Sequence, residues 1–213
     1  IPGNDLDGVL EGTAFLRNVR LGTPPKMGKR ILVLGGGDVA FDVARTALRL
    51  GSSQVHMAFL ESGDSMAASP REFQAGIAEG LVLHPSRSFV RIMDDGGQVS
   101  GVECLSVESF SFLPDGRLDL KTAPGSEHVL ECDTVIFAVG QGVEAGFLSK
   151  DSGVGITPRG TVAADPESMD TDRPGVFAAG DAVTGTSFVV EAIAAGHRAA
   201  TAIDRYLSGE DQE

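Results

Sequence analysis

Three glycines between an apolar run and an amphipathic run are the first residues of the chain suited to ligand chemistry. Arg30 to Leu34 predicts a buried strand, and Asp38 to Leu50 predicts a helix. The turn and the first residues of the helix are Gly35, Gly36, Gly37, Asp38, Val39 and Ala40. Gly35 permits a tight turn, Gly37 lets a pyrophosphate approach the backbone, and Ala40 lets the helix pack closely on a sheet. The pattern predicts a dinucleotide site at the helix N-terminus, and the alternative is a glycine turn with a structural role only.

A single carboxylate is placed where it would select between the two pyridine dinucleotides. Gln54 to Leu60 predicts the next strand, and Glu61 follows it at about the usual spacing of roughly 20 residues from the glycine turn. An acidic side chain at this place accepts hydrogen bonds from the adenosine ribose, whereas arginines would hold a 2′-phosphate. Glu61 therefore favours NAD(H) over NADP(H). The alternative is a loop carboxylate that contacts only solvent.

A second candidate site lies toward the C-terminal end. Val176 to Ala179 predicts a short apolar strand, and a glycine turn then brings Asp181 to the carboxyl edge, where open α/β sheets bind ligands. Ser187 to Ala202 predicts a helix that begins at Thr186 or Ser187 as N-cap. The positive end of this helix suits the pyrimidine edge of a reduced isoalloxazine, and Asp181 suits ribityl hydroxyls. The alternative is a buried strand followed by an alanine-rich core helix.

The remaining elements predict an α/β fold. Glu11 to Leu21 and Pro70 to Glu79 have the pattern of helices, and Leu81 to Leu83 that of a third strand. Between residues 89 and 130 the period shortens to brief strands separated by turn residues, which indicates an antiparallel meander. Asp133 to Val139 is a continuous apolar run, as in a strand buried on both faces. The expected architecture is a Rossmann-like domain with an added meander.

Composition excludes several classes of partner. The 213 residues carry a formal net charge of −13, which argues against nucleic acid and against an anionic membrane surface. Cys104 and Cys132 do not form a CxxC pair, so a dithiol redox centre is not indicated, and a reducing cytoplasmic location is expected. The chain opens on Ile1 within loop-like sequence, and we expect it to be part of a longer protein. The histidines show no metal-ligand spacing and predict structural or surface roles: His56, His84, His128 and His197.

Four segments taken together resemble the flavin-dependent pyridine nucleotide-disulfide oxidoreductases of the glutamate synthase small-subunit type. They are residues 1–10, 35–47, 133–141 and 174–181, and the helix after Val189 continues the last of them. The resemblance implies two interleaved dinucleotide-binding domains. Its domain assignment is residues 24–144 to the NAD(P)H-binding domain, and residues 1–23 and 145–213 to the remnant of an FAD domain.

The same resemblance assigns residues to the pyridine nucleotide. Gly35, Gly37 and Asp38 would line its phosphates. Gly140 and Gln141 would lie near its nicotinamide. Many members of the family carry Tyr-Arg-Arg after the second strand, which suits NADPH. In this chain Glu61 stands at the third of these positions, and the departure from the family pattern again favours NAD(H).

The resemblance also assigns residues to the flavin. Gly180 and Asp181 would hold its pyrophosphate–ribityl region, and the backbone of Ala192 would face its pyrimidine ring. The family begins with an FAD-binding strand, glycine loop and helix, and the sequence before Gly35 has none. We therefore expect FAD in the full-length parent and not in this chain by itself.

The function implied is hydride transfer from NAD(P)H to FAD, with electrons passed to an iron–sulfur or flavoprotein partner. Hydride passes directly between nicotinamide and flavin, so no catalytic side chain is assigned. One alternative is a disulfide reductase of the thioredoxin reductase kind, against which the lack of a CxxC stands. Another is a nucleotide-binding module without catalysis. A homodimer is a further expectation, because a second copy would cover apolar surface left open in residues 145–213.

Overall fold

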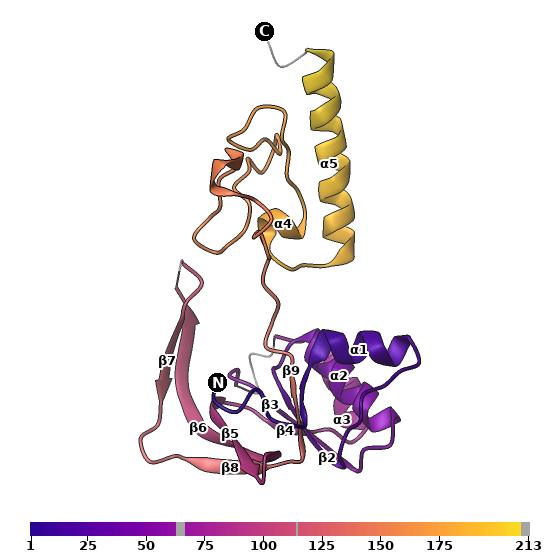
Figure 1. Cartoon of the computed structure of the whole chain (residues 1–213), viewed down its shortest axis with the longest axis vertical. Helices are drawn as coiled ribbons and strands as arrows, with labels where there is room; N and C mark the ends of the chain where they lie inside the picture. Colours follow the sequence, from indigo (N-terminus) through magenta and orange to yellow (C-terminus); the bar gives the residue numbers. More distant parts are fainter. Residues whose placement is uncertain (63–66, 114, 210–213) are drawn as a thin grey trace. The chain divides into compact units, whose positions relative to one another are not determined.

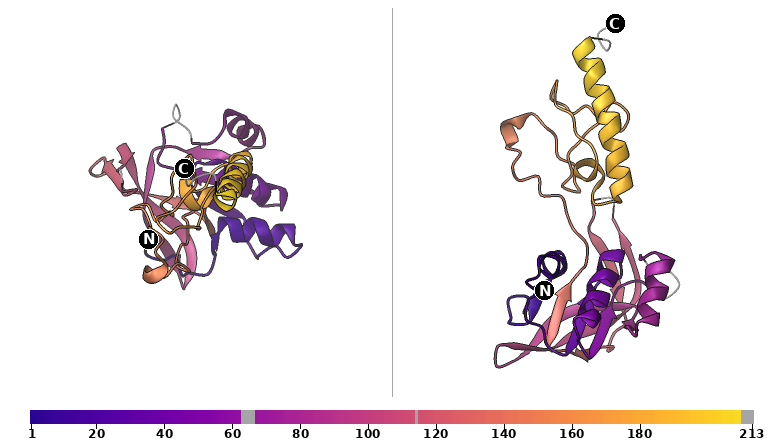
Figure 2. Two further views of the ribbon diagram at one scale, coloured as in Figure 1. Left: turned by 90° about the horizontal axis from the view of Figure 1, so that it is seen from above. Right: turned by 90° about the vertical axis from the view of Figure 1, so that its right-hand side faces the viewer.

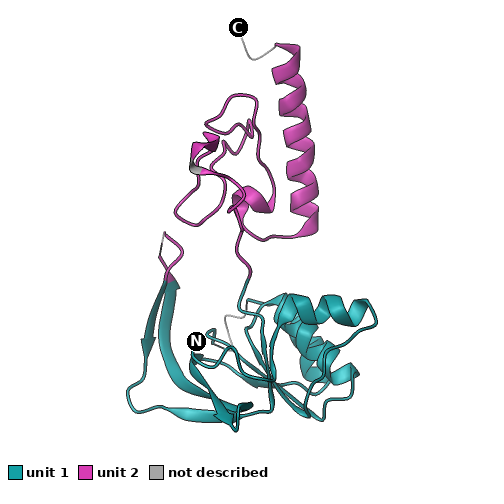
Figure 3. Ribbon diagram, in the orientation of Figure 1, with its two compact units in different colours: residues 1–111, 118–140 teal, residues 112–117, 141–213 magenta. Residues whose placement is uncertain are grey.

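The computed structural model describes residues 1–62, 67–113 and 115–209, which form two compact units (Figure 3). Unit 1 comprises residues 1–111 and 118–140. Unit 2 comprises residues 112–117 and 141–213. Each unit has its own helices and buried residues, and each is described separately below.

A five-stranded parallel sheet forms the centre of unit 1. Its strands lie in the order β1-β9-β2-β3-β4. Their bounds are Val9–Glu11 for β1, Arg30–Leu34 for β2, Gln54–Ala58 for β3, Val82–His84 for β4 and Thr134–Phe137 for β9. Along β2, Ile31 and Val33 belong to one apolar cluster, while Leu32 and Leu34 belong to another on the opposite face. Burial on both faces explains why this strand is continuously apolar.

Three helices cover one face of the parallel sheet (Figure 1). They are α1 (Gly12–Arg20), α2 (Asp38–Arg49) and α3 (Pro70–Ala78). Phe15 and Phe41 are fully buried between the helices and the sheet. The rings of Phe41 and Phe73 meet edge to face at 6.1 Å, so α2 and α3 are held together by aromatic packing.

The meander covers the other face. Its strands are β5 (Arg87–Asp95), β6 (Gln98–Phe112), β7 (Leu118–Thr122) and β8 (His128–Glu131). The strand β6 pairs antiparallel with β5 and with β8, and also lies beside β7. Ile92, Val102 and Cys104 pack from these strands against the parallel sheet. The predicted α/β class with an added meander is confirmed, although β6 continues further than the sequence indicated.

The N-terminal segment corrects one expectation. The chain opens in loop-like sequence for which no strand was predicted, but Val9–Glu11 pairs with β9 as an edge strand. Glu11 caps α1, since its carboxylate accepts hydrogen bonds from the amides of Thr13 and Ala14 at 3.0 and 2.6 Å. Residues 1–23 therefore pack within unit 1 of this chain. Their assignment to a flavin domain remains a prediction.

Unit 2 contains one long helix and extended loops. Its elements are the short 3₁₀-helix η1 (Lys150–Ser152), α4 (Asp181–Thr184) and α5 (Val189–Ser208). Figure 2 shows α5 as one continuous helix with the loops of this unit along one side. Val162, Met169 and Ala195 are its buried apolar residues among those described.

Two expectations about unit 2 are wrong. The apolar run from residue 176 to 179 forms a single bridge, between Phe177 and Asp170, because no strand of the described residues pairs with it further. The helix begins later than predicted, with Phe188 as N-cap, and ends later as well. The Ser187 hydroxyl is bonded to the Glu191 carboxylate and does not cap the backbone.

Candidate functional site

The glycine turn has the geometry that a dinucleotide loop requires. Gly35 adopts φ +130°, and a Cβ added there would lie 2.2 Å from the carbonyl oxygen of Ala138. Gly37 is the N-cap of α2, and a Cβ there would meet no atom within 4 Å. Ala40 is fully buried in the core. The loop is therefore tightly packed beneath and open at Gly37, in front of helix amides that have no partner within the helix.

Glu61 lies beside this loop. Its Oε2 atom is 3.0 Å from the position that a Cβ on Gly36 would occupy. Its carbonyl oxygen accepts a hydrogen bond from the amide of Ser86 at 2.9 Å, which fixes the backbone after β3. Val39, in the first turn of α2, is exposed. The fold thus brings the carboxylate to the glycine turn, as the spacing suggested.

The residues predicted near the nicotinamide stand where the two units join in sequence. Gly140 adopts φ +107° after β9, and Gln141 is the first residue of the C-terminal part of unit 2. The carbonyl oxygen of Gln141 accepts a 3.5 Å hydrogen bond from the hydroxyl of Thr186. Their contact with a nicotinamide remains a prediction.

The residues predicted for the flavin meet within unit 2. Gly180 adopts φ +63°, and a Cβ there would lie 3.8 Å from the Cα atom of Ala192. Asp181 is the first residue of α4 and is exposed. The start of α5 presents a run of exposed apolar side chains, namely Phe188, Val189, Val190 and Ile193. The glycine turn and the helix are therefore adjacent, and the apolar surface beside them is open to solvent in this chain.

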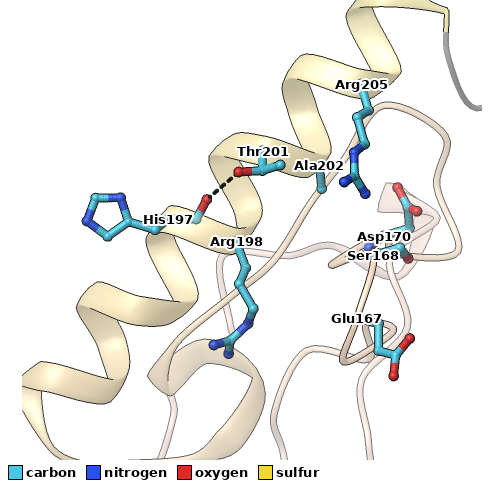
Figure 4. Close-up of a pocket in the computed structure, with 8 residues that line it drawn as sticks. All are labelled: Glu167, Ser168, Asp170, His197, Arg198, Thr201, Ala202 and Arg205. Carbon is cyan, nitrogen blue, oxygen red and sulfur yellow. Dashed lines mark hydrogen bonds between the residues drawn. The ribbon is translucent and has the colours of Figure 1, made fainter.

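A cleft of about 360 Å³ lies elsewhere in unit 2, between α5 and the segment around residues 167–170 (Figure 4). None of the predicted cofactor residues lines it. Arg198 and Arg205 come from the helix, and Glu167 and Asp170 come from the facing segment. The two positive charges of the lining are matched in number by two carboxylates.

Two of the histidines that the sequence left scattered are brought together in unit 1. The Nδ1 atom of His56 lies 2.9 Å from Nε2 of His84, and the rings stack with centroids 5.1 Å apart. One nitrogen donates and the other accepts, which requires at least one neutral ring. Burial lowers the pKa of both rings. The charges of His56, Arg87 and His128 lower the pKa of His84 further. The pair occupies neighbouring strands, β3 and β4, and its predicted structural role remains a prediction.

This pair predicts acid sensitivity. In the unfolded chain both rings bind protons near pH 6.5, whereas the folded chain keeps them neutral to lower pH. Their contribution to stability is therefore present above about pH 6.5 and lost as the pH falls through their lowered pKa values. We expect the free energy of unfolding to fall between pH 7 and pH 5.

The double variant His56→Gln/His84→Gln should flatten this dependence, whereas His197→Gln, on the exposed face of α5, should leave it unchanged. Urea denaturation across this pH range measures the difference. The prediction is contradicted if the free energy of unfolding falls with pH as steeply in the double variant as in the parent chain.

The two cysteines of the chain belong to the apolar cluster between the parallel sheet and the meander. Both are free and buried, and burial raises the pKa of Cys104 to about 11 and of Cys132 to about 12. Such thiols are not thiolates at neutral pH. Within residues 1–62, 67–113 and 115–209, no group of three His, Cys, Asp or Glu side chains is arranged to hold a metal ion. In the same residues, no helix has both the length and the apolar character to cross a membrane.

Comparisons with known proteins agree with this geometry. The beta subunit of the NADP(+)-dependent formate dehydrogenase of Moorella thermoacetica is 39% identical over 201 residues, which cover 94% of this chain and 28% of that protein. The small chain of glutamate synthase (NADPH) from Escherichia coli is 37% identical over 186 residues, which cover 84% of this chain and 39% of that protein. The crystal structure of T. acidophilum thioredoxin reductase matches with a TM-score of 0.67 and 26% identity, over 85% of this chain and 53% of that one.

The chain spans less than two fifths of the length of the two curated relatives. The resemblance to the glutamate synthase small subunit is confirmed at the level of sequence identity. A family model described as pyridine nucleotide-disulphide oxidoreductase matches residues 1–196, which include the glycine turn, β9 and the Gly180–Asp181 turn. The chain belongs to the pyridine nucleotide-disulphide oxidoreductase family.

Proposed function

We propose that the chain is the nucleotide-binding part of an enzyme that transfers hydride from a pyridine dinucleotide to FAD. The observation that carries this proposal is the open space at Gly37, in front of the first amides of α2. Oriented amides and the positive end of a helix bind phosphate groups. When bound, the nicotinamide supplies the hydride and the flavin accepts it, so the protein positions the two groups and supplies no acid or base.

We infer that unit 1 holds the dinucleotide by its phosphates and its adenosine ribose. Gly35 and Gly37 keep the backbone clear for the pyrophosphate. Glu61 accepts hydrogen bonds from the ribose hydroxyls. Gly140 and Gln141 are assigned to the nicotinamide side. In unit 2, Gly180, Asp181 and Ala192 are assigned to the flavin, and their closeness supports that assignment.

We propose that NADH is preferred to NADPH. The support is the carboxylate of Glu61 beside Gly36, where it would meet the 2′-phosphate of NADPH as a like charge. The names of the two relatives specify NADP(+) and NADPH, and they point the other way. Binding to this chain therefore has to be measured with both nucleotides.

Glu61→Gln tests this preference. The substitution removes the charge and keeps the shape, so we expect affinity for NADPH to rise about tenfold and affinity for NADH to change less. Calorimetric titration with each nucleotide gives the two dissociation constants. Glu127→Gln, an exposed site before β8, makes the same charge change elsewhere and should alter neither. A parent chain that binds NADPH more tightly would overturn the preference and direct attention to Arg71, at the start of α3.

We propose that the parent enzyme passes its electrons to a partner protein. The two relatives are by their names a beta subunit and a small chain, which supports a partner subunit for the parent enzyme. We propose that this partner is an iron–sulfur protein or a flavoprotein. We also infer a cytoplasmic location, consistent with two buried free thiols.

We propose a homodimer through the apolar start of α5. Sedimentation of the chain tests it, and Val190→Lys should shift any dimer to monomer.

The disulfide reductase alternative is disfavoured by the thiols. Cys104 and Cys132 are buried and their pKa values are raised, whereas an exchanging thiol is accessible and ionised. The remaining alternative is a nucleotide-binding module without catalysis. A measurement on the parent protein separates the oxidoreductase from the module without catalysis. If the parent is an oxidoreductase, its flavin absorbance at roughly 450 nm should bleach when NADH is added.

A further inference from the structure

A short connection joins the parallel sheet to the meander. β4 ends at His84 and β5 begins at Arg87, with Pro85 and Ser86 between them. Ser86 adopts φ +56°, a left-handed conformation that residues other than glycine rarely adopt. The Nη1 atom of Arg87 donates to the carbonyl oxygens of Pro85 and Ser86, at 2.9 and 3.0 Å. The carbonyl oxygen of Ser86 also accepts from the amide of Val107 at 2.9 Å. The arginine therefore binds both carbonyl groups of the connection and holds it in this conformation.

The same connection holds the segment that follows β3. The amide of Arg87 donates to the carbonyl oxygen of Phe59 at 2.8 Å, and the amide of Ser86 donates to that of Glu61 at 2.9 Å. In the other direction, the amide of Phe59 donates to the carbonyl oxygen of His84 at 3.3 Å. The place of the segment after β3 therefore depends on the conformation of the connection.

This segment also lies against the glycine turn. The amide of Gly35 donates to the carbonyl oxygen of Ala58 at 2.8 Å. A Cβ added to Gly36 would lie 2.9 Å from the Cβ of Phe59 and 3.0 Å from Oε2 of Glu61. Phe59 is fully buried. Any displacement of the segment would therefore move the Glu61 carboxylate relative to the turn.

We propose that Arg87 is a positioning residue, which holds Glu61 beside Gly36 and so sets the selectivity between NADH and NADPH. This inference rests on the proposed function, because it uses the assignment of Glu61 to the adenosine ribose. A guanidinium is charged at every pH at which the protein is folded, so the contact with the two carbonyl groups does not depend on pH. Arg87 acts through the backbone of Ser86 and does not touch the nucleotide.

Arg87→Met tests the inference. Methionine fills the space of the side-chain stem and removes the buried Nε atom, which has no hydrogen-bond partner among the residues that the structure describes. With the connection loosened, Glu61 is placed less well for the ribose, so affinity for NADH should fall and repulsion of the 2′-phosphate should weaken. We expect calorimetric titration to show the ratio of the NADPH to the NADH dissociation constant about fivefold lower.

Arg91→Met is the matched control. It makes the same change on the same strand, where Arg91 is exposed and pairs with Glu103 at 2.6 Å. It should leave the ratio unchanged. If Arg87→Met does not fold, Arg87→Lys keeps the charge, and its side chain is one bond too short to reach the place of Nη1. We expect it to lower the ratio in the same direction, about threefold.

A double-mutant cycle tests whether Arg87 acts through Glu61. In the Glu61→Gln background, Arg87→Met should change the ratio by less than about twofold, because no charge is left to be placed. A fivefold fall in that background as well would overturn the inference, because Arg87 would then act independently of Glu61. Weaker binding of NADPH in Arg87→Met, with NADH unchanged, would also overturn it, because the guanidinium would then hold the 2′-phosphate itself.

Hydrogen exchange separates the positioning from the proposed function, because it needs no nucleotide. The amides of Ser86 and Arg91 lie on the same stretch of chain, but we expect Arg87→Met to accelerate exchange at Ser86 and at residue 87 only. If the parent chain binds neither nucleotide, the proposed function fails, and this acceleration would still support the hold on the connection. Faster exchange with an unchanged ratio would mean that Arg87 is structural only, and unchanged exchange would refute the positioning.

Discussion

Gly37→Val is expected to weaken binding of NADH to the chain about 100-fold while the fold is kept. Gly37 adopts φ −85° and ψ 174°, which any residue tolerates, and its added Cβ meets no protein atom within 4 Å. The branched side chain would fill the space in front of the α2 amides and keep phosphates from them. The cost to folding is limited to the poorer N-cap, about 1 kcal/mol.

Calorimetric titration with NADH and a urea unfolding curve measure the two effects separately. Gly146→Val is a matched control, since a Cβ there also meets no atom within 4 Å, and it should bind NADH normally. Gly35→Ala should instead disturb the fold, because its Cβ would lie 2.2 Å from the Ala138 carbonyl oxygen and φ is +130°. We expect it to destabilise the chain by about 2–5 kcal/mol. Unchanged affinity in Gly37→Val would mean that the glycine turn is structural only.

The 213-residue chain is expected to bind FAD at least about 1,000-fold more weakly than a flavoprotein that holds both halves of the cofactor, a difference of about 4 kcal/mol. The flavin residues of this chain are the Gly180–Asp181 turn and the start of α5, which approach each other at Gly180 and Ala192. Among the residues that the structure describes, one strand, glycine turn and helix of the dinucleotide type is present, at Gly35 in the unit proposed for the pyridine nucleotide. We therefore expect the chain to make only a minority of the contacts by which a complete flavoprotein holds FAD.

Absorbance of the purified chain tests this directly. We expect a colourless preparation and no saturable quenching of FAD fluorescence at micromolar concentrations. Asp181→Asn, which keeps the shape of the turn, should lower any residual affinity further. A yellow preparation with stoichiometric FAD would contradict the prediction and would show that unit 2 forms a flavin site by itself.

Sequence determined the parts of this protein that depend on neighbouring residues and on burial. The glycine turn was predictable because positive φ and close packing at Gly35 select glycine whatever surrounds it. β2 and β9 were predictable because strands buried on both faces are continuously apolar. The place of Glu61 beside the turn followed from a strand–helix–strand unit of regular length.

Tertiary structure alone decided the features that join distant residues. β1 exists because it pairs with β9, and the run from residue 176 to 179 makes only one bridge because no strand of the described residues lies beside it. His56 and His84 contact each other, and Asp38 binds Ser69, through packing of separate elements. Such contacts leave no periodic pattern in the chain, because a pairing partner or a hydrogen-bond acceptor can stand at any separation in sequence. Only the folded arrangement of sheet and helices fixes which residues meet.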